Sequence, residues 1–355
     1  MILSKKNICN YLIDKNLVSL KSVVEGDLML RDVSSRNTNF LVNQFGKDGQ
    51  KLLVKQPDVA NIKYVQAMKV EAGIYALIHN KAVCSKIRKY VPQLHQYDDE
   101  NHILVMEQLS GVCRVFDYLY YGTYYPDKQI LKMLATILKN FHQIPIERAK
   151  ILTPTYPWFL DIMDKKYGQQ VEKDNKKAYK ILKPILHNTQ VIQFMQESKA
   201  MWQSTHFIHL DTRLSNWMMP YTHRAGQKCP IWLIDFELAG IGDAAWDIGF
   251  LLGDLLLFDA YLKVKNPKIT PNKNYLPISE AIQYFWEIYA NKRAMEANFE
   301  ERVIRYTAIK VFMAVYENVV DEEDPSLDTQ LKLLIDLFLD MVKHPKLHQN
   351  LLVRK

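Results

Sequence analysis

Two short stretches carry most of the chemical information in this chain. Residues 207–219 read FIHLDTRLSNWMM, and residues 231–237 read IWLIDFE. In both stretches polar side chains border short apolar runs, so we expect Asp211 and Asn216 on a loop between short strands and Asp235 at the tip of a buried strand. A carboxylate at such a tip is held rigidly while its oxygens face open space, which suits a metal ligand.

These residue types fit the transfer of a phosphoryl group to a hydroxyl. That reaction needs a carboxylate that orients the hydroxyl and accepts its proton, together with oxygen ligands for magnesium at the phosphates. We assign the first role to Asp211 and the second to Asn216 and Asp235, whereas His209 is expected to shape the loop by hydrogen bonding. The pattern His-x-Asp-x4-Asn also arises by chance, but here the second acidic motif follows about twenty residues later.

The two stretches resemble the aminoglycoside phosphotransferase and choline kinase family, small-molecule kinases that share the two-lobed protein-kinase fold. Two more segments are similar to that family: Leu138-x-x-Phe141-His142-x-x-Pro145, and Gly242-Asp243-x-x-x-Asp247-Ile248-Gly249. The resemblance runs from about residue 20 to 340 and is sharp over 206–250. It implies an α+β, protein-kinase-like fold with a small antiparallel-sheet N-lobe, residues 1–108, and a larger, mainly helical C-lobe, residues 109–355. Within the C-lobe, Tyr125-Pro126-Asp127 is expected to open an amphipathic helix that runs to about His142, and two prolines with three asparagines predict a loop over residues 266–274.

The resemblance also implies residues for the nucleotide phosphates. Lys55 lies near the end of a predicted strand and Glu71 in a predicted helix, matching the lysine that grips the α- and β-phosphates and the glutamate that holds it. Ordinary surface charges are the alternative. The turn over residues 33–39 contains no glycine, yet Ser35 and Asn37 can still form a tight turn that presents amides or hydroxyls to phosphate. An ordinary hairpin turn explains them nearly as well.

The apolar strand 102–109 occupies the place of the hinge between lobes. The resemblance implies that Met106 lies beside the adenine pocket and that Glu107 and Leu109 contribute backbone contacts to the base. The donor is then ATP or GTP, accompanied by Mg²⁺.

Arg213 and Asp247 have supporting roles in this interpretation. A guanidinium two residues after Asp211 can stabilise charge that builds on the transferred phosphoryl group, or it can form a structural ion pair. Asp247 lies within an apolar helix and must be paired there, so we expect it to anchor the backbone of the loop that carries Asp211.

Composition excludes several other classes. The chain has 355 residues, 48% of them hydrophobic, and a net charge of +7 that is scattered rather than clustered, so no nucleic-acid partner is expected. Four cysteines at wide spacing and the absence of a signal-like N-terminus indicate a cytoplasmic protein. The longest apolar stretch, residues 248–257, is too short to cross a membrane. Oligomeric state is not readable from the sequence.

The acceptor stays open at this stage, although the resemblance implies that its pocket is built from residues 156–202 and about 277–342. Aromatic residues gather in 156–202 and 275–316, and residues 321–324 are all acidic, so an aminoglycoside, an amino alcohol, a sugar, a nucleoside or a natural product all remain candidates. Aromatics at helical spacing are more often core. A pseudokinase is the alternative function, favoured only by the glycine-free turn. A protein kinase is disfavoured because no long activation segment separates Asp235 from Gly242.

Overall fold

The computed structural model describes residues 1–34, 37–45, 49–122, 125–148, 152–265, 271, 275–291, 296–322 and 327–352. The chain divides into two compact units. The first contains Met1–Val112 and Trp232–Ala239, and the second contains Cys113–Ile231 and Gly240–Lys355. The first unit thus ends after residue 112 rather than 108, and it includes the later segment that carries Asp235. That the two units act as separate functional lobes stays a prediction.

An antiparallel sheet forms the first unit. Its strand order is β1-β2-β3-β5-β4, and each neighbouring pair is antiparallel. Side chains alternate between the two faces of each strand, so Leu52 and Val54 are buried on one face while Lys55 points to the other. The strands are β1 (Leu28–Asp32), β2 (Thr38–Gln44), β3 (Lys51–Gln56), β4 (Leu94–Asp98) and β5 (Ile103–Glu107).

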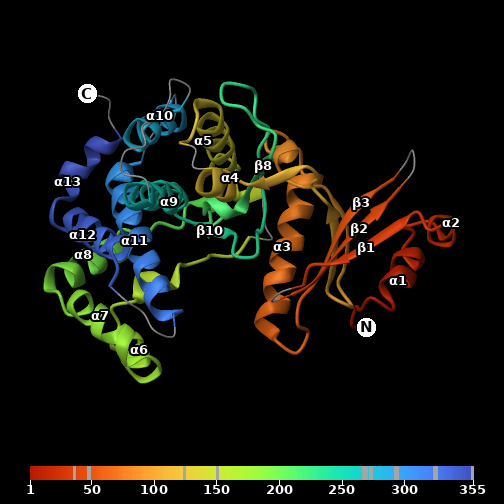
Figure 1. The fold of residues 1–355 in the computed structure, drawn as a ribbon, viewed down its shortest axis with the longest axis horizontal. Coiled ribbons are helices and arrows are strands. Elements are labelled where there is room, and N and C mark those ends of the chain that lie inside the picture. Colours follow the sequence, from red (N-terminus) through yellow and green to blue (C-terminus); the bar gives the residue numbers. More distant parts are fainter. Residues whose placement is uncertain are drawn as a thin grey trace. The chain divides into compact units, whose positions relative to one another are not determined.

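Helices cover both faces of this sheet. Helix α1 (Ile8–Asp14) packs Ile8 and Leu12 against Val54 in one apolar cluster, and α2 (Leu20–Val24) follows it. Helix α3 (Ile62–Asn80) lies on the opposite face, where Lys55 contacts Glu71 (Figure 1). The remaining elements of the unit are η1 (Ala82–Cys84), η2 (Arg88–Tyr90) and β9 (Trp232–Leu233).

The second unit is mainly helical. Its helices are α4 (Val115–Gly122), α5 (Lys128–His142), α6 (Lys165–Asp174), α7 (Lys176–Leu186), α8 (Thr189–Ala200), α9 (Ala244–Lys265), α10 (Ile278–Ala290), α11 (Phe299–Val320), α12 (Thr329–Lys343) and α13 (Pro345–His348). Short elements connect them: β6 (Val112–Arg114), η3 (Ile146–Arg148), η4 (Trp158–Asp161), β7 (His206–Ile208), η5 (Leu214–Asn216), β8 (Trp217–Pro220), β10 (Gly240–Gly242) and η6 (Gln349–Leu351). The sheet in one unit and the helices in the other confirm the predicted fold class.

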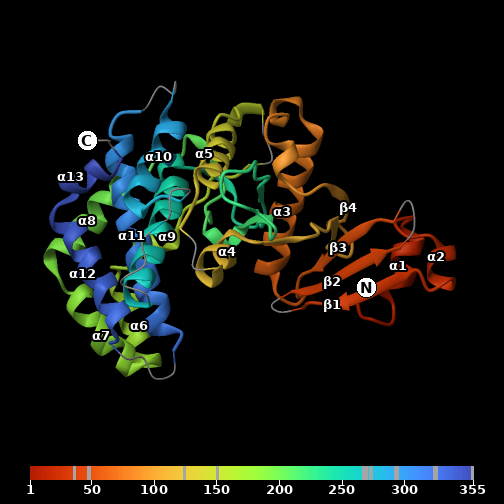
Figure 2. The ribbon, with the colours of Figure 1, turned by 45° about the horizontal axis from the view of Figure 1, so that its top comes forward.

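Helices α9 and α11 approach each other closely in the core of this unit (Figure 2). Two glycines of α9 make the approach possible. A Cβ atom at Gly249 would lie 2.7 Å from Tyr306 Cβ, and one at Gly253 would lie 2.5 Å from Lys310 Cγ. Any larger residue at these positions would push the helices apart.

Helix α5 begins where the sequence predicted it. Asp127 caps its N-terminus, because Asp127 Oδ1 accepts hydrogen bonds from the amides of Gln129 at 2.7 Å and Ile130 at 3.3 Å. The apolar stripe of α5 is buried, as its spacing predicted. Most of the predicted loop over 266–274 lies outside the described residues.

Candidate active site

Lys55, Glu71 and Asp235 come together in the first unit. Lys55 Nζ donates to both carboxylate oxygens of Glu71, at 2.8 and 2.7 Å, and lies 3.5 Å from Asp235 Oδ1. Glu71 is buried, with its side chain 2% exposed, whereas the side chain of Asp235 is 36% exposed. The predicted lysine–glutamate pair is therefore present, and a carboxylate with open oxygens lies beside it.

The electrostatics of this cluster follow from burial and charge. Burial alone lowers the pKa of Lys55, but the carboxylates of Glu71 and Asp235 outweigh it and raise that pKa well above its usual range. Burial raises the pKa of Glu71 to about 6, although Lys55 opposes the shift. At neutral pH Lys55 is thus a fixed positive charge, which is what an anionic phosphate requires.

Helix α3 also fixes the chain beside Asp235. Tyr75 lies one turn after Glu71 and so on the same face of α3. Its ring meets the ring of Phe236 edge to face, with centroids 5.3 Å apart. Asp235 itself has φ 69°, an uncommon value for a residue with a side chain. The contact of Asp235 with Lys55 and the packing of Phe236 against Tyr75 therefore hold Asp235 in its strained backbone conformation.

Loop 209–216 brings the other predicted residues together in the second unit. Arg213 Nε donates to Asp211 Oδ1 at 2.6 Å, and Asn216 Nδ2 donates to Asp211 Oδ2 at 3.0 Å and to the Asp211 carbonyl at 2.9 Å. The Asn216 amide nitrogen is therefore used within the loop, and these hydrogen bonds do not involve its Oδ1. His209 accepts from the Asp211 amide at 3.3 Å, which confirms its predicted role in shaping the loop.

Asp247 on α9 anchors the start of this loop, as predicted. Its carboxylate accepts the amides of His209 and Leu210, each at 2.8 Å, and a hydrogen bond at 3.0 Å joins it to the ring of His142. Burial raises the pKa of Asp247 to about 6, against the opposing effect of its partners. Leu210 has φ 70°, so the anchor holds the residue ahead of Asp211 in a conformation that leucine rarely adopts.

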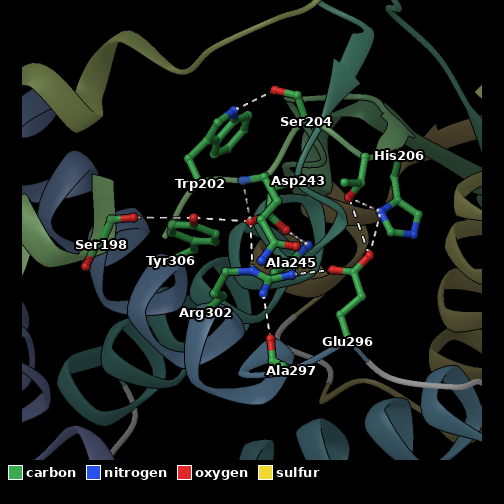
Figure 3. A network of polar contacts seen from close by, with 12 residues as sticks. Ser198, Trp202, Ser204, His206, Asp243, Ala245, Glu296, Ala297, Arg302 and Tyr306 are labelled. Atoms are coloured by element: carbon green, nitrogen blue, oxygen red, sulfur yellow. Dashed lines mark hydrogen bonds and ion pairs between the residues drawn. The ribbon is translucent and has the colours of Figure 1, made fainter. Parts of the chain in front are cut away.

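A second network fixes the chain that leads into the loop (Figure 3). Asp243 accepts the amides of Ala245 at 3.0 Å and Gln203 at 3.3 Å, and it lies 2.9 Å from Arg302 Nε of α11. Arg302 also pairs with Glu296. Buried charges are stable only when paired in this way. The network therefore ties α11 to the beginning of α9 and to the segment before β7.

A cavity of about 390 Å³ lies beside the loop in the second unit. Arg213 and Ser215 contribute to its wall directly from the loop. Other lining residues come from helices α4, α9, α11 and α12 or from the residue before α4, among them Arg114, Phe116, Tyr120, Asp254, Lys310 and Glu317. A cavity of this size is typical of a small-molecule site.

Most of the charges in this cavity are closely paired. Arg114 pairs with Asp117 at 2.7 Å, Lys310 with Asp254 at 3.2 Å, and Arg213 with Asp211. Burial lowers the pKa of Arg213, but the carboxylates of Asp211 and Glu317 outweigh it and raise that pKa. Within the part of the chain that the structure describes, Glu317 thus acts on Arg213 at longer range, without a hydrogen bond to its carboxylate.

The predicted base-binding and turn residues have less distinctive surroundings. Met106 is buried in β5. The amide of Glu107 donates to the Gln93 carbonyl at 2.8 Å and the amide of Gln108 to the Lys51 carbonyl at 2.8 Å, so the sheet uses both, and Leu109 follows them. Ser35 lies outside the described residues. Asn37 is half-buried just before β2, and its Oδ1 has no hydrogen-bond partner among the described residues.

The family model described as the phosphotransferase enzyme family matches residues 31–262. The chain belongs to this phosphotransferase family. A comparison with curated proteins finds no match. Among solved structures, this phosphotransferase resembles choline kinase from Cryptosporidium parvum Iowa II, with 15% identity, 98% of both chains covered and a TM-score of 0.58.

Two further structures share the fold. The GDP complex of aminoglycoside 2'-phosphotransferase-IIIa has 12% identity over 96% of this phosphotransferase and 100% of that chain, with a TM-score of 0.54. The streptomycin–ATP–APH(2")-IIa ternary complex has 15% identity over 96% and 97% of the two chains, with a TM-score of 0.50. The family membership and the fold confirm the resemblance found in the sequence. No helix within the described ranges is long and apolar enough to span a membrane.

Sequence reasoning missed part of the cavity of this phosphotransferase. The resemblance implied an acceptor pocket built from residues 156–202 and about 277–342. The second range does contribute, through α11 and α12, but the lining residues also come from α4 and α9 and do not include any from 156–202. Phe116 and Tyr120 lie one turn apart on α4, and that spacing is the signal that could have pointed to them.

Proposed function

We propose that this phosphotransferase transfers the γ-phosphoryl group of ATP or GTP to a hydroxyl of a small molecule, with Asp211 as the base. The observation that carries the proposal is the geometry of loop 209–216. Both oxygens of Asp211 are held in place, by Arg213 and Asn216, and the loop forms part of the wall of a cavity large enough for an acceptor. A fixed carboxylate can orient the hydroxyl and take its proton as the phosphoryl group arrives.

We assign nucleotide binding to the residues that the sequence resemblance implied, and the contact between Lys55 and Glu71 supports the assignment for these two. Lys55, held by Glu71, pairs with the phosphates. Met106 lies against the base, while Glu107 and Leu109 offer backbone groups to its edge. Ser35 and Asn37 belong to the turn proposed to cover the phosphates. GDP and ATP are the nucleotides in the two similar complexes named above, which supports a nucleoside triphosphate as donor.

Asn216 and Asp235 fit magnesium. Asn216 directs its amide nitrogen to Asp211 and keeps Oδ1 for a ligand, and Asp235 carries exposed carboxylate oxygens. Magnesium prefers a few such hard oxygens and takes its other ligands from phosphates and water. The ion would neutralise charge on the phosphates.

Arg213 serves two purposes in this proposal. Its Nε is used on Asp211, while its terminal nitrogens have no hydrogen-bond partner among the described residues. Because Arg213 also contributes to the cavity wall, these nitrogens can meet the oxygens of the phosphoryl group in transit. The structural and the catalytic roles that the sequence left open are therefore compatible.

The carboxylate of Glu317 in the cavity wall favours an acceptor that carries an amine, because it has no hydrogen-bond partner among the described residues. An ammonium group could pair with it, and the stacked rings of Phe116 and Tyr120, with centroids 4.2 Å apart, offer an aromatic surface to the same molecule. Choline and aminoglycosides, the substrates named for two similar proteins, combine hydroxyl and amine groups. We therefore place amino alcohols and amino sugars ahead of neutral sugars and nucleosides.

Turnover of MgATP and MgGTP by the purified protein, alone and with choline, ethanolamine, aminoglycosides, sugars and nucleosides, tests the proposal. We expect one amine-bearing class to stimulate turnover and Asp211→Asn to abolish it while nucleotide binding persists. Glu317→Gln should raise the acceptor KM, whereas Asp321→Asn, beyond the end of α11 and outside this cavity, should not. Nucleotide binding without turnover for every acceptor would instead support a pseudokinase.

A further inference from the structure

Helix α9 contacts loop 209–216 at two places. Asp247 accepts the amides of His209 and Leu210 at the start of the loop, and Asp254 accepts the amide of Leu214 at 2.6 Å near its end. Seven residues separate the two carboxylates, which is close to two helical turns, so both lie on the same face of α9. Asp211 and Arg213 lie between the two anchored positions.

The second anchor is a buried one. Leu214 is fully buried and the side chain of Asp254 is 11% exposed, so water cannot easily replace their hydrogen bond. An amide that lost this acceptor would stay unpaired unless the loop moved. The bond between Leu214 and Asp254 therefore restricts the conformation of the segment that carries Arg213 and Asn216.

Lys310 on α11 fixes the carboxylate of Asp254. Lys310 Nζ lies 3.2 Å from Asp254 Oδ1, which leaves Oδ2 for the Leu214 amide. The side chain of Lys310 is 4% exposed, runs past Gly253 and places its ammonium 4.6 Å from the centre of the Phe250 ring. Because both charged groups are largely buried, loss of either one would leave the other as an unpaired charge, which is strongly unfavourable. The pair is consequently rigid.

We propose that Asp254 is a positioning residue for phosphoryl transfer, acting through Leu214 to hold Asp211, Arg213 and Asn216 in their mutual arrangement. The inference rests on the proposed function. Asp254 and Lys310 also contribute to the cavity wall beside Arg213 and Ser215, so the groups that position the loop are the groups that an acceptor meets. Small displacements of reacting groups are enough to slow a transfer greatly.

Three variants separate positioning from general stability. Asp254→Ala removes the acceptor for the Leu214 amide. Asp254→Asn combined with Lys310→Met removes both charges but keeps a side-chain oxygen for that amide. Asp259→Asn is the matched control, because Asp259 lies on the same helix, forms an ion pair with the solvent-exposed Lys263 and is not among the residues that line the cavity. Circular dichroism and thermal unfolding verify that each variant folds.

Two readouts are compared. The first is the rate of deuterium exchange in peptides that cover residues 209–216, which requires no acceptor. The second is MgATP turnover, with water and with any acceptor found. For Asp254→Ala we expect faster exchange and a kcat lower by about tenfold to a hundredfold, with little change in the KM for ATP. The double variant should retain slow exchange in these peptides, and Asp259→Asn should match the parent protein in both readouts.

The outcomes distinguish this inference from the proposed function. Unchanged exchange in Asp254→Ala, or unchanged kcat while Asp211→Asn is inactive, would overturn the positioning role and leave the kinase intact. If the double variant exchanges as fast as Asp254→Ala, the charge rather than the hydrogen bond holds the loop, and the inference is wrong. If the parent protein shows no turnover, the proposed function and the role of Asp254 in transfer both fail, and exchange still reports whether Asp254 anchors the loop.

Discussion

Arg213 Nε donates to Asp211 Oδ1 at 2.6 Å, so the two charged side chains of loop 209–216 hold each other. Arg213→Gln removes the ion pair and the positive charge at the cavity. We expect kcat to fall by about tenfold to a hundredfold while the KM for nucleotide changes little. Arg213→Lys keeps the positive charge but lacks the Nε group that donates to Asp211, so its kcat should lie between those of the parent protein and Arg213→Gln. Steady-state kinetics at varied MgATP measure both constants, and a rise in KM alone would contradict the assigned role.

Lys55→Met should weaken both nucleotide binding and the fold. Glu71 is buried, and without Lys55 its charge would be uncompensated, which costs about 3 to 5 kcal/mol when a buried pair is broken. The double variant Lys55→Met with Glu71→Gln should regain stability without regaining nucleotide affinity. Denaturant unfolding and calorimetric titration with MgATP separate these effects. Equal stability of the single and double variants would show that the pair carries no such cost.

Asp98 gives the first unit a defined acid sensitivity. Burial raises the pKa of Asp98, but hydrogen bonds from Asn101 and the ion pair with Lys15 outweigh it and lower that pKa from 3.8 to about 2. Because the folded pKa is below the unfolded one, the stabilisation is fully present above about pH 4 and is lost as pH falls toward 2. The shift corresponds to about 2 kcal/mol.

Asp98→Asn is therefore expected to lower the free energy of unfolding near pH 7 by up to about 2 kcal/mol, with the difference from the parent protein shrinking toward pH 2. Denaturant titrations at several pH values measure this. A difference that is constant across that range would mean that the charge of Asp98 contributes nothing.

Gly253→Ala tests the close approach of α9 and α11. The added methyl would lie 2.5 Å from Lys310 Cγ, so the variant should lose about 1 to 3 kcal/mol through overpacking and displace Lys310 from Asp254. Gly168→Ala in α6 is the control, because its nearest neighbour is 3.9 Å away. That variant should gain up to about 1 kcal/mol from helix propensity. Thermal unfolding of both variants provides the comparison.

The sequence was sufficient for features that depend on short-range pattern. The apolar pattern placed Lys55 near the end of a strand and Glu71 in a helix, the resemblance implied that the two side chains meet, and the structure pairs them. Asp247 was predicted as an anchor because an acidic residue inside an apolar helix must find partners. The roles of these residues toward a nucleotide stay predictions.

The partners of Asp254 could not be predicted from the sequence pattern. In the sequence Asp254 merely interrupts an apolar stretch, and only the packing of α9 against α11 and the loop reveals its partners, Lys310 and Leu214. The contribution of α4 to the cavity was missed for the same reason, since it depends on how distant helices meet. The first unit's later segment, 232–239, likewise cannot be assigned from a boundary drawn along the chain.

That discontinuity has a consequence for synthesis. Residues 1–112 leave the ribosome first, but the unit they form also requires Trp232–Ala239. At ordinary elongation rates the missing segment follows roughly ten seconds later. Until then Lys55 and Glu71 can pair, whereas Asp235 is not yet made. During this interval a nascent chain contains the pair of Lys55 and Glu71 but lacks Asp235. We therefore expect that the chain becomes able to bind a nucleotide together with its metal only late in translation, after the sheet has formed.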